Sequence, residues 1–144
     1  YYRLGMFDEA IAAYEAALRA TPSLYLANFR LGVIYYYRGH LEKAIAMYKT
    51  ALEHNPNLKF IHYHLAIAYA RRGLLKETIE QFKIVLAMDP KMAAAHYHIG
   101  CAYYYKGDLD KAMAHFEKAL SLDPLDEQSA RNLRTLKDLR GRFF

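Results

Sequence analysis

A 34-residue internal period is the feature that most constrains the fold of this chain. Four residue types recur in register at this step. The columns are Pro22, Pro56, Pro90 and Pro124; Gly5, Gly39, Gly73 and Gly107; Tyr1, Tyr35, Tyr69 and Tyr103; and Leu18, Leu52, Leu86 and Leu120. Such columns indicate stacked repeats, because each small repeat can bury its apolar face only against its neighbours.

The first part of each period has the spacing of an α-helix. Residues 25–38 place Leu31, Ile34 and Tyr35 on one face, at steps of three and four. Gly39 follows, and glycine ends a helix readily because a positive φ costs it little. A short helix and a tight turn are therefore predicted here.

A second helix is predicted over residues 41–54. Its apolar face comprises Leu41, Ala44, Ile45, Tyr48, Ala51 and Leu52. Pro56 ends it, because the residue before a proline is disfavoured in the helical region. In the third repeat, Asp108 is the predicted N-cap of the equivalent helix.

The pattern resembles the tetratricopeptide repeat family, whose repeats carry Trp, Leu-Gly, Tyr, Ala, Phe and Pro at fixed positions. The matching residues are Asn28, Leu31-Gly32, Tyr35, Ala44, Tyr48 and Pro56; His62, Leu65-Ala66, Tyr69, Thr78, Phe82 and Pro90; and His96, Ile99-Gly100, Tyr103, Ala112, Phe116 and Pro124. The family's tryptophan is replaced by Asn or His each time. The resemblance covers residues 1–124 and implies an all-α fold, a right-handed α-solenoid of antiparallel helix pairs (the tetratricopeptide-like superhelix).

Five segments are predicted along the chain. Residues 1–24 are the second helix of a partial first repeat, and residues 25–58, 59–92 and 93–126 are full repeats. Residues 127–144 break the pattern and are predicted to form a capping helix with a basic tail. The chain opens without Met in the middle of a repeat, so an upstream part is expected to be missing.

The charge distribution does not favour nucleic acid as a partner. Of the net charge of +5, residues 131–144 carry +4, from five basic residues against Asp138, so the other 130 residues sum to +1. RNA binding, in which bases stack on tyrosine rings, is one hypothesis for the function. It predicts an affinity that falls steeply as the salt concentration rises. The nearly neutral body argues against it.

Membrane insertion and a disulfide framework are not expected. The stretch MAAAHYHIGCAYYY carries no formal charge over 14 residues, which is too short for a membrane span. The lone Cys101 excludes an internal disulfide and fits a reducing compartment, which favours the cytoplasm. The sequence does not otherwise indicate a localisation.

The resemblance implies that the first helix of each repeat lines a concave, partner-binding groove. The predicted groove residues are Leu26, Phe29, Arg30, Val33, Tyr36 and Tyr37; Phe60, Tyr63, His64, Ile67 and Arg71; and Tyr97, His98, Cys101, Tyr104 and Tyr105. Stacked helices should align them in three ladders. The ladders are Phe29, Tyr63 and Tyr97; Arg30, His64 and His98; and Val33, Ile67 and Cys101.

The aromatic residues of the groove have two readings. They could merely pack one repeat against the next, but packing does not require bulky rings on a concave rim. Tyrosine suits recognition, because it offers large contact area at low entropy cost and a polar tip. By contrast, Tyr35, Tyr69 and Tyr103 lie in the column of core positions and are predicted to be buried.

No catalytic or metal site is predicted. His62 and His64 are two residues apart on a helix, as are His96 and His98, so each pair points about 200° apart. His64 and His98 face the same way, but they lie on helices separated by about 8–10 Å. Cys101 has no CxxC partner, and the chain has no P-loop, GxSxG, HExxH or dinucleotide motif. The chain is therefore predicted to be no enzyme and to use no cofactor.

The function predicted is a non-catalytic protein–protein interaction module that binds a peptide or helix of a partner protein, with no small-molecule substrate. The alternative is a structural or self-association scaffold without a dedicated peptide ligand, which would pair through the open edge of the first repeat. Family members that hold acidic chaperone tails use a clamp of Lys, Arg and Asn. The matching positions here are Phe29, Val33, His64, Ala94 and His98, with Arg30 the one basic residue beside them. Capture of acidic chaperone tails is therefore not expected.

Overall fold

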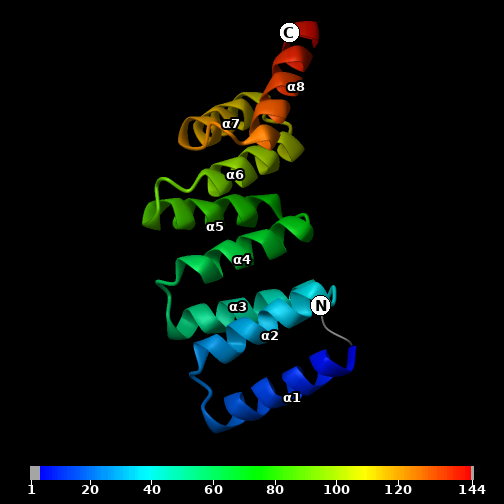
Figure 1. Cartoon of the computed structure of the whole chain (residues 1–144), viewed down its shortest axis with the longest axis vertical. Coiled ribbons are helices and arrows are strands. Elements are labelled where there is room, and N and C mark those ends of the chain that lie inside the picture. The colour runs from blue at the N-terminus through cyan, green and yellow to red at the C-terminus, as the bar shows by residue number, and fades with distance from the viewer. Residues whose placement is uncertain (1–3, 144) are drawn as a thin grey trace. The chain divides into compact units, whose positions relative to one another are not determined.

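The computed structural model describes residues 4–143, which form eight α-helices and no strand (Figure 1). The helices are α1 (Leu4–Ala20), α2 (Tyr25–Tyr37), α3 (Leu41–His54), α4 (Lys59–Arg71), α5 (Leu75–Met88), α6 (Ala93–Lys106), α7 (Leu109–Leu122) and α8 (Glu127–Phe143). They divide between two compact units, Tyr1–Arg72 (unit 1) and Gly73–Phe144 (unit 2). The predicted all-α helical-repeat solenoid is confirmed, whereas the repeat boundaries stay a prediction.

In unit 1, α1 packs on α2, α2 on α3, and α3 on α4. In unit 2, α5 packs on α6, α6 on α7, and α7 on α8. Each unit has its own apolar core. The largest fully buried side chains are Leu31, Tyr48, Ile61 and Leu65 in unit 1, and Phe82, Val85, Ile99, Phe116 and Leu136 in unit 2.

The helix ends follow the local chemistry of the sequence. Gly39, Gly73 and Gly107 take φ values of 82°, 77° and 85°, which confirms the predicted glycine turns. The Asp108 carboxylate accepts a hydrogen bond from the backbone N–H of Lys111 at 3.2 Å, so the predicted N-cap of α7 is also confirmed.

The column of core tyrosines is buried in two of its three described members. Tyr69 and Tyr103 are 7% and 9% exposed, as predicted. Tyr35 differs from the prediction, because it is only partly buried. The Lys43 ammonium lies 5.4 Å from the centroid of the Tyr35 ring. None of the described helices is long and apolar enough to cross a membrane.

The last helix, α8, buries apolar side chains on one of its faces. Leu133 and Leu136 are 8% and 2% exposed, and α8 packs on α7. The basic residues of α8 for which exposure is described all face solvent: Arg131, Arg134, Lys137, Arg140 and Arg142. This division of one helix into an apolar and a charged side is what a capping helix requires.

Candidate functional site

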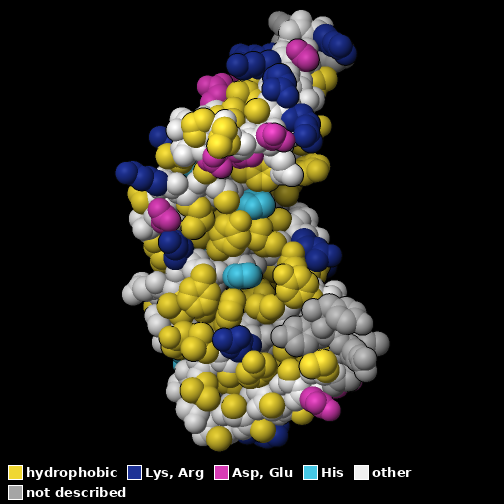
Figure 2. Space-filling view, viewed as in Figure 1, with side chains coloured by type: hydrophobic (Ala, Val, Ile, Leu, Met, Phe, Trp, Pro, Cys, Tyr) yellow, Lys and Arg dark blue, Asp and Glu magenta, His cyan; other side chains and the backbone are white. Residues whose placement is uncertain are grey.

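The main candidate site is an aromatic-lined groove in unit 1, here called the Phe29 groove, with a volume of about 630 Å³. Its walls are Phe7, Ala10 and Tyr14 from α1; Phe29, Arg30, Val33, Ile34 and Tyr37 from α2; and His64 from α4. Figure 2 shows hydrophobic side chains gathered on the visible face of unit 1, with a histidine and a basic side chain among them. The groove falls in the size range of ligand pockets.

A cluster of rings holds the groove wall in place. The ring of Phe29 meets Phe60 edge to face at 5.0 Å between centroids, and meets His64 at 5.1 Å. Below them, Tyr48 lies 5.9 Å from Phe29 and is 1% exposed. Edge-to-face contacts of this kind favour fixed ring orientations, so the wall is preformed.

The Phe29 groove has few charged side chains among its lining residues. Burial lowers the pKa of His64, so this imidazole is neutral at pH 7. Burial likewise raises the pKa of Tyr48, with smaller contributions from Tyr36 and Tyr37, and the hydroxyl stays protonated. Among the residues that line the groove, Arg30 therefore carries the charge.

One exposed tyrosine, Tyr37, lies at the rim of the groove. Tyr37 is 72% exposed and lines the groove, while its neighbour Tyr36 meets it edge to face at 5.3 Å. The Arg71 guanidinium from α4 lies 5.0 Å from the Tyr36 ring centroid, a cation–π contact that braces the rim. A large ring held half in solvent is a ready contact for a partner.

Unit 2 has a smaller groove of about 310 Å³, here called the Tyr97 groove. It is lined by Tyr97, Cys101, Tyr104 and Tyr105 from α6, Phe116 from α7, and Asn132, Thr135 and Leu136 from α8. Burial and hydrogen bonding with Cys101 raise the pKa of Tyr97 to about 12, although a hydrogen bond with Asn132 acts in the other direction. Burial also raises the pKa of the Cys101 thiol, which disfavours the thiolate that a nucleophile needs.

Nine of the predicted groove residues line one of the two grooves. The Phe29 groove takes Phe29, Arg30, Val33, Tyr37 and His64, and the Tyr97 groove takes Tyr97, Cys101, Tyr104 and Tyr105. Seven line neither groove: Leu26, Tyr36, Phe60, Tyr63, Ile67, Arg71 and His98. Of these, His98 stacks face to face on the buried Phe82, with 5.1 Å between the ring centroids. A partner-binding role for all of these residues, and the ladders that join one unit with the other, stay predictions.

Some groove residues are not predicted from the sequence. Phe7 and Tyr14 belong to α1, which the repeat pattern assigns to a partial repeat rather than to a groove wall. Asn132 and Thr135 belong to α8, predicted only as a cap. The signal that marks Tyr14 is its place in the column of Tyr48, Phe82 and Phe116, which indicates an aromatic ring but not where the ring points.

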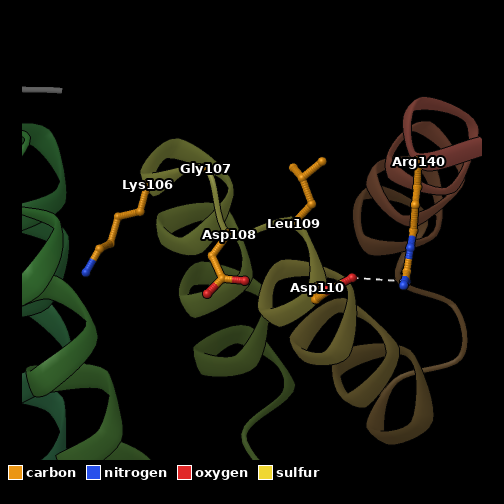
Figure 3. Close-up of a pocket in the computed structure, with 6 residues that line it drawn as sticks. All are labelled: Lys106, Gly107, Asp108, Leu109, Asp110 and Arg140. Atoms are coloured by element: carbon orange, nitrogen blue, oxygen red, sulfur yellow. Dashed lines mark ion pairs between the residues drawn. The ribbon is translucent and has the colours of Figure 1, made fainter. Parts of the chain in front are cut away.

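A polar recess of about 490 Å³ lies where α7 begins. Figure 3 shows Arg140 of α8 pointing toward Asp110 of α7, and the two form an ion pair of 3.0 Å. Both side chains are more than half exposed, at 56% and 74%, so the pair contributes little to stability. The Asp108 carboxylate caps α7, so the polar residues of the recess have a structural role at the start of this helix. The recess is therefore not a candidate site.

Comparisons with known proteins agree with this architecture. Family profiles described as tetratricopeptide repeat match residues 1–58, 29–83 and 93–125. A crystal structure of MamA is 25% identical, with a TM-score of 0.90 over 98% of this chain and 86% of that chain. MamA from Desulfovibrio magneticus RS-1 is 21% identical, with a TM-score of 0.88 over 95% of this chain and 77% of that chain.

A further solved structure is the first TPR of Spaghetti (RPAP3) bound to the HSP90 peptide SRMEEVD. It is 20% identical, with a TM-score of 0.76 over 81% of this chain and 93% of that chain. A search of curated protein sequences gave no significant match. The fold supports a protein–protein interaction module, and the family is typically a non-catalytic scaffold. Because the profiles match more than half of the sequence, the chain belongs to the tetratricopeptide repeat family.

Proposed function

We propose that this chain binds a short peptide segment of a partner protein in the Phe29 groove. The segment presents a large apolar or aromatic anchor, with a carboxylate close to it. The observation that carries the proposal is a preformed aromatic groove of about 630 Å³ in which Arg30 supplies the charge.

The walls of the groove favour an apolar anchor. Phe29, Tyr14 and Val33 present rings and methyl groups to the hollow, so an incoming side chain is removed from water on several sides. The exposed Tyr37 ring can close over one edge of that side chain. We expect a dissociation constant near the micromolar range, which corresponds to a binding free energy of about −8 kcal/mol.

One guanidinium sets the charge preference. Arg30 is exposed and can pair with one carboxylate of the ligand, an interaction worth up to about 1 kcal/mol at an exposed site. His64 adds no second charge at pH 7, because burial lowers its pKa. A peptide with a single acidic residue beside its anchor is therefore favoured over a strongly acidic chaperone tail.

Selection from a random peptide library on the purified protein tests the proposal. Enriched peptides are expected to share an aromatic or large aliphatic anchor, and their affinity is read by fluorescence polarisation. Tyr37→Ala and Arg30→Gln should weaken binding at least several-fold. Leu125→Ala is the matched control, because Leu125 is 88% exposed and lies outside the groove. Peptides that bind the Tyr37→Ala and Arg30→Gln proteins as tightly as the unmodified chain would contradict the proposal.

Self-association is a second candidate function, and α1 carries the observation that favours it. Met6, Ala12, Ala13 and Ala16 are exposed along this helix, with Ala13 seven residues after Met6 and Ala16 four residues after Ala12. Such an apolar stripe can pair with a second copy. Light scattering at increasing concentration should then show dimers that Ala13→Glu abolishes. A monomer at every concentration excludes this candidate.

A further inference from the structure

Two histidines outside both grooves face each other in unit 2. His96 of α6 and His115 of α7 approach with 3.1 Å between their Nδ1 atoms, and 5.4 Å between ring centroids. The centroid separation exceeds the Nδ1–Nδ1 distance by about one ring diameter. The two nitrogens therefore lie between the rings and point at one another, in a contact in which one Nδ1 donates and the other accepts.

The surroundings of the pair are aromatic and basic. The Tyr103 ring stacks on His115 at 5.6 Å, and the Lys111 ammonium lies 5.4 Å from the Tyr103 centroid. Burial lowers the pKa of both imidazoles, and the charges of Lys118 near His96 and Lys83 near His115 lower it further. Both rings are partly buried, so solvent reaches the pair.

We propose that His96 and His115 together bind a divalent transition-metal ion of the class that takes imidazole ligands, such as Zn²⁺, through their two Nδ1 atoms. The remaining coordination positions are filled by water. Imidazole is a preferred ligand for Zn²⁺, Ni²⁺ and Cu²⁺. A site with two protein ligands and open positions is a weak site compared with a closed structural zinc centre.

The spacing of the two nitrogens fits a shared ion. With Zn–N bonds of about 2.0–2.1 Å in tetrahedral geometry, two nitrogen ligands lie about 3.3 Å apart. The observed 3.1 Å between Nδ1 atoms is close to this value. The ion would sit to one side of the line between them, so each ring must turn about its soft terminal torsion while the backbones of α6 and α7 stay in place.

Each ring must offer an unprotonated Nδ1 to the ion, because the metal takes the lone pair of that nitrogen. As the ion binds, the ring whose Nδ1 donates changes its tautomer, and its proton moves from Nδ1 to Nε2 of the same ring. Two neutral imidazoles, each with a free Nδ1 lone pair, are then the ligands. Lys83 and Lys118 repel the cation and weaken binding. Among the described residues, no group of three or more His, Cys, Asp or Glu side chains forms a fuller site.

The repeat supplies a matched comparison within the chain. In the two columns that meet here, the first full repeat has Asn28 and Met47, and the second has His62 and Gln81. His62 also has a different environment, since its Nε2 lies 2.8 Å from the carbonyl oxygen of Pro56. His62→Gln is therefore a control that removes a histidine from the same column without touching the proposed site.

Calorimetric titration of the tag-free chain with ZnCl₂ at pH 7.5 tests the proposal. One equivalent of Zn²⁺ should bind, at least tenfold more weakly in His96→Gln and in His115→Gln, and unchanged in His62→Gln. Circular dichroism verifies that each variant keeps its helix content. Should a variant fail to fold, nitrogen couplings from two imidazoles in the electron paramagnetic resonance spectrum of the Cu²⁺-loaded unmodified chain decide instead. Zn²⁺ binding that persists in the folded double variant, absence of Zn²⁺ binding by the unmodified chain, or Cu²⁺ couplings from fewer than two imidazoles would overturn the proposal.

Discussion

Gly32 lies directly against the ring of Tyr48. A Cβ added at position 32 would stand 2.5 Å from Cε1 and 2.7 Å from Cδ1 of that ring, closer than carbon atoms approach in proteins. Gly100 has the same relation to Phe116, with 2.8 Å to Cε1. Glycine is therefore required after Leu31 and after Ile99, because the aromatic ring of the second helix of the repeat fills the space that a side chain at this position would need.

Gly32→Ala is therefore expected to destabilise the chain. Overpacking a filled core costs about 1–3 kcal/mol, against a gain of about 1 kcal/mol from the better helix propensity of alanine. Gly141→Ala is the matched control, because position 141 in α8 is exposed and has no neighbour within 4 Å. Urea unfolding should show a lower free energy for Gly32→Ala and an equal or slightly higher one for Gly141→Ala. Equal free energies for the two variants would refute the contact argument.

Gly39→Ala separates backbone strain from packing. Gly39 has a φ of 82° and no atom within 4 Å of an added Cβ, so the cost is conformational alone. Placing alanine in the left-handed region costs about 1–2 kcal/mol. Gly39→Asn should cost less, since asparagine tolerates this region better. Thermal unfolding that ranks glycine above asparagine above alanine supports this account, and a stabilised Gly39→Ala protein would exclude it.

Tyr37 and Tyr48 should respond very differently to truncation, although both contribute to the Phe29 groove or its base. Tyr48→Ala empties a core site that is 1% exposed and is expected to cost about 3–5 kcal/mol of stability. Tyr37→Ala removes a ring that is 72% exposed, so the free energy of unfolding should change by less than about 0.5 kcal/mol. Denaturant melts of the two variants check this. A large loss for Tyr37→Ala would place its ring in the core and remove it as a ligand contact.

The sequence predicts what depends on local chemistry and on the face of a helix. Gly39 and Gly107 mark turns because positive φ selects glycine, and Asp108 marks a helix start because its carboxylate can accept a backbone N–H. The repeat columns place Tyr48 and Phe116 in the core, because a period of 34 residues keeps the same face inward in each repeat. These features follow from short-range rules applied at each repeat.

The sequence does not predict which side chains of neighbouring helices meet. His96 and His115 are 19 residues apart, and their contact depends on how α6 and α7 are rotated against each other. Tyr35 shares a column with Tyr69 yet is only partly buried, because burial depends on what packs beside each repeat and not on the column. The walls that α1 and α8 add to the two grooves are likewise not predicted, since the repeat columns do not specify which residues of these helices face a groove.

Four partly buried imidazoles give the folded chain a pH dependence whose sign can be worked out. Burial lowers the pKa of His64, His96, His98 and His115. In the unfolded chain these imidazoles have a pKa of about 6.5. Between the folded and unfolded pKa values the unfolded chain binds more protons, so unfolding is favoured as the pH falls. The stability is therefore fully present above about pH 6.5 and is lost as the pH falls through 6.5 toward the lower folded values.

The midpoint of urea unfolding is thus expected to fall between pH 7.5 and pH 5.5. Within this effect, His115 contributes through its contact with His96, because two protonated Nδ1 atoms would place two donors and two positive charges face to face at 3.1 Å, beside Lys83 and Lys118. His115→Gln should therefore flatten the pH dependence, while His54→Gln, at an exposed position near the end of α3, should leave it unchanged. A midpoint that stays constant or rises on acidification would show that the buried imidazoles do not govern stability in this range.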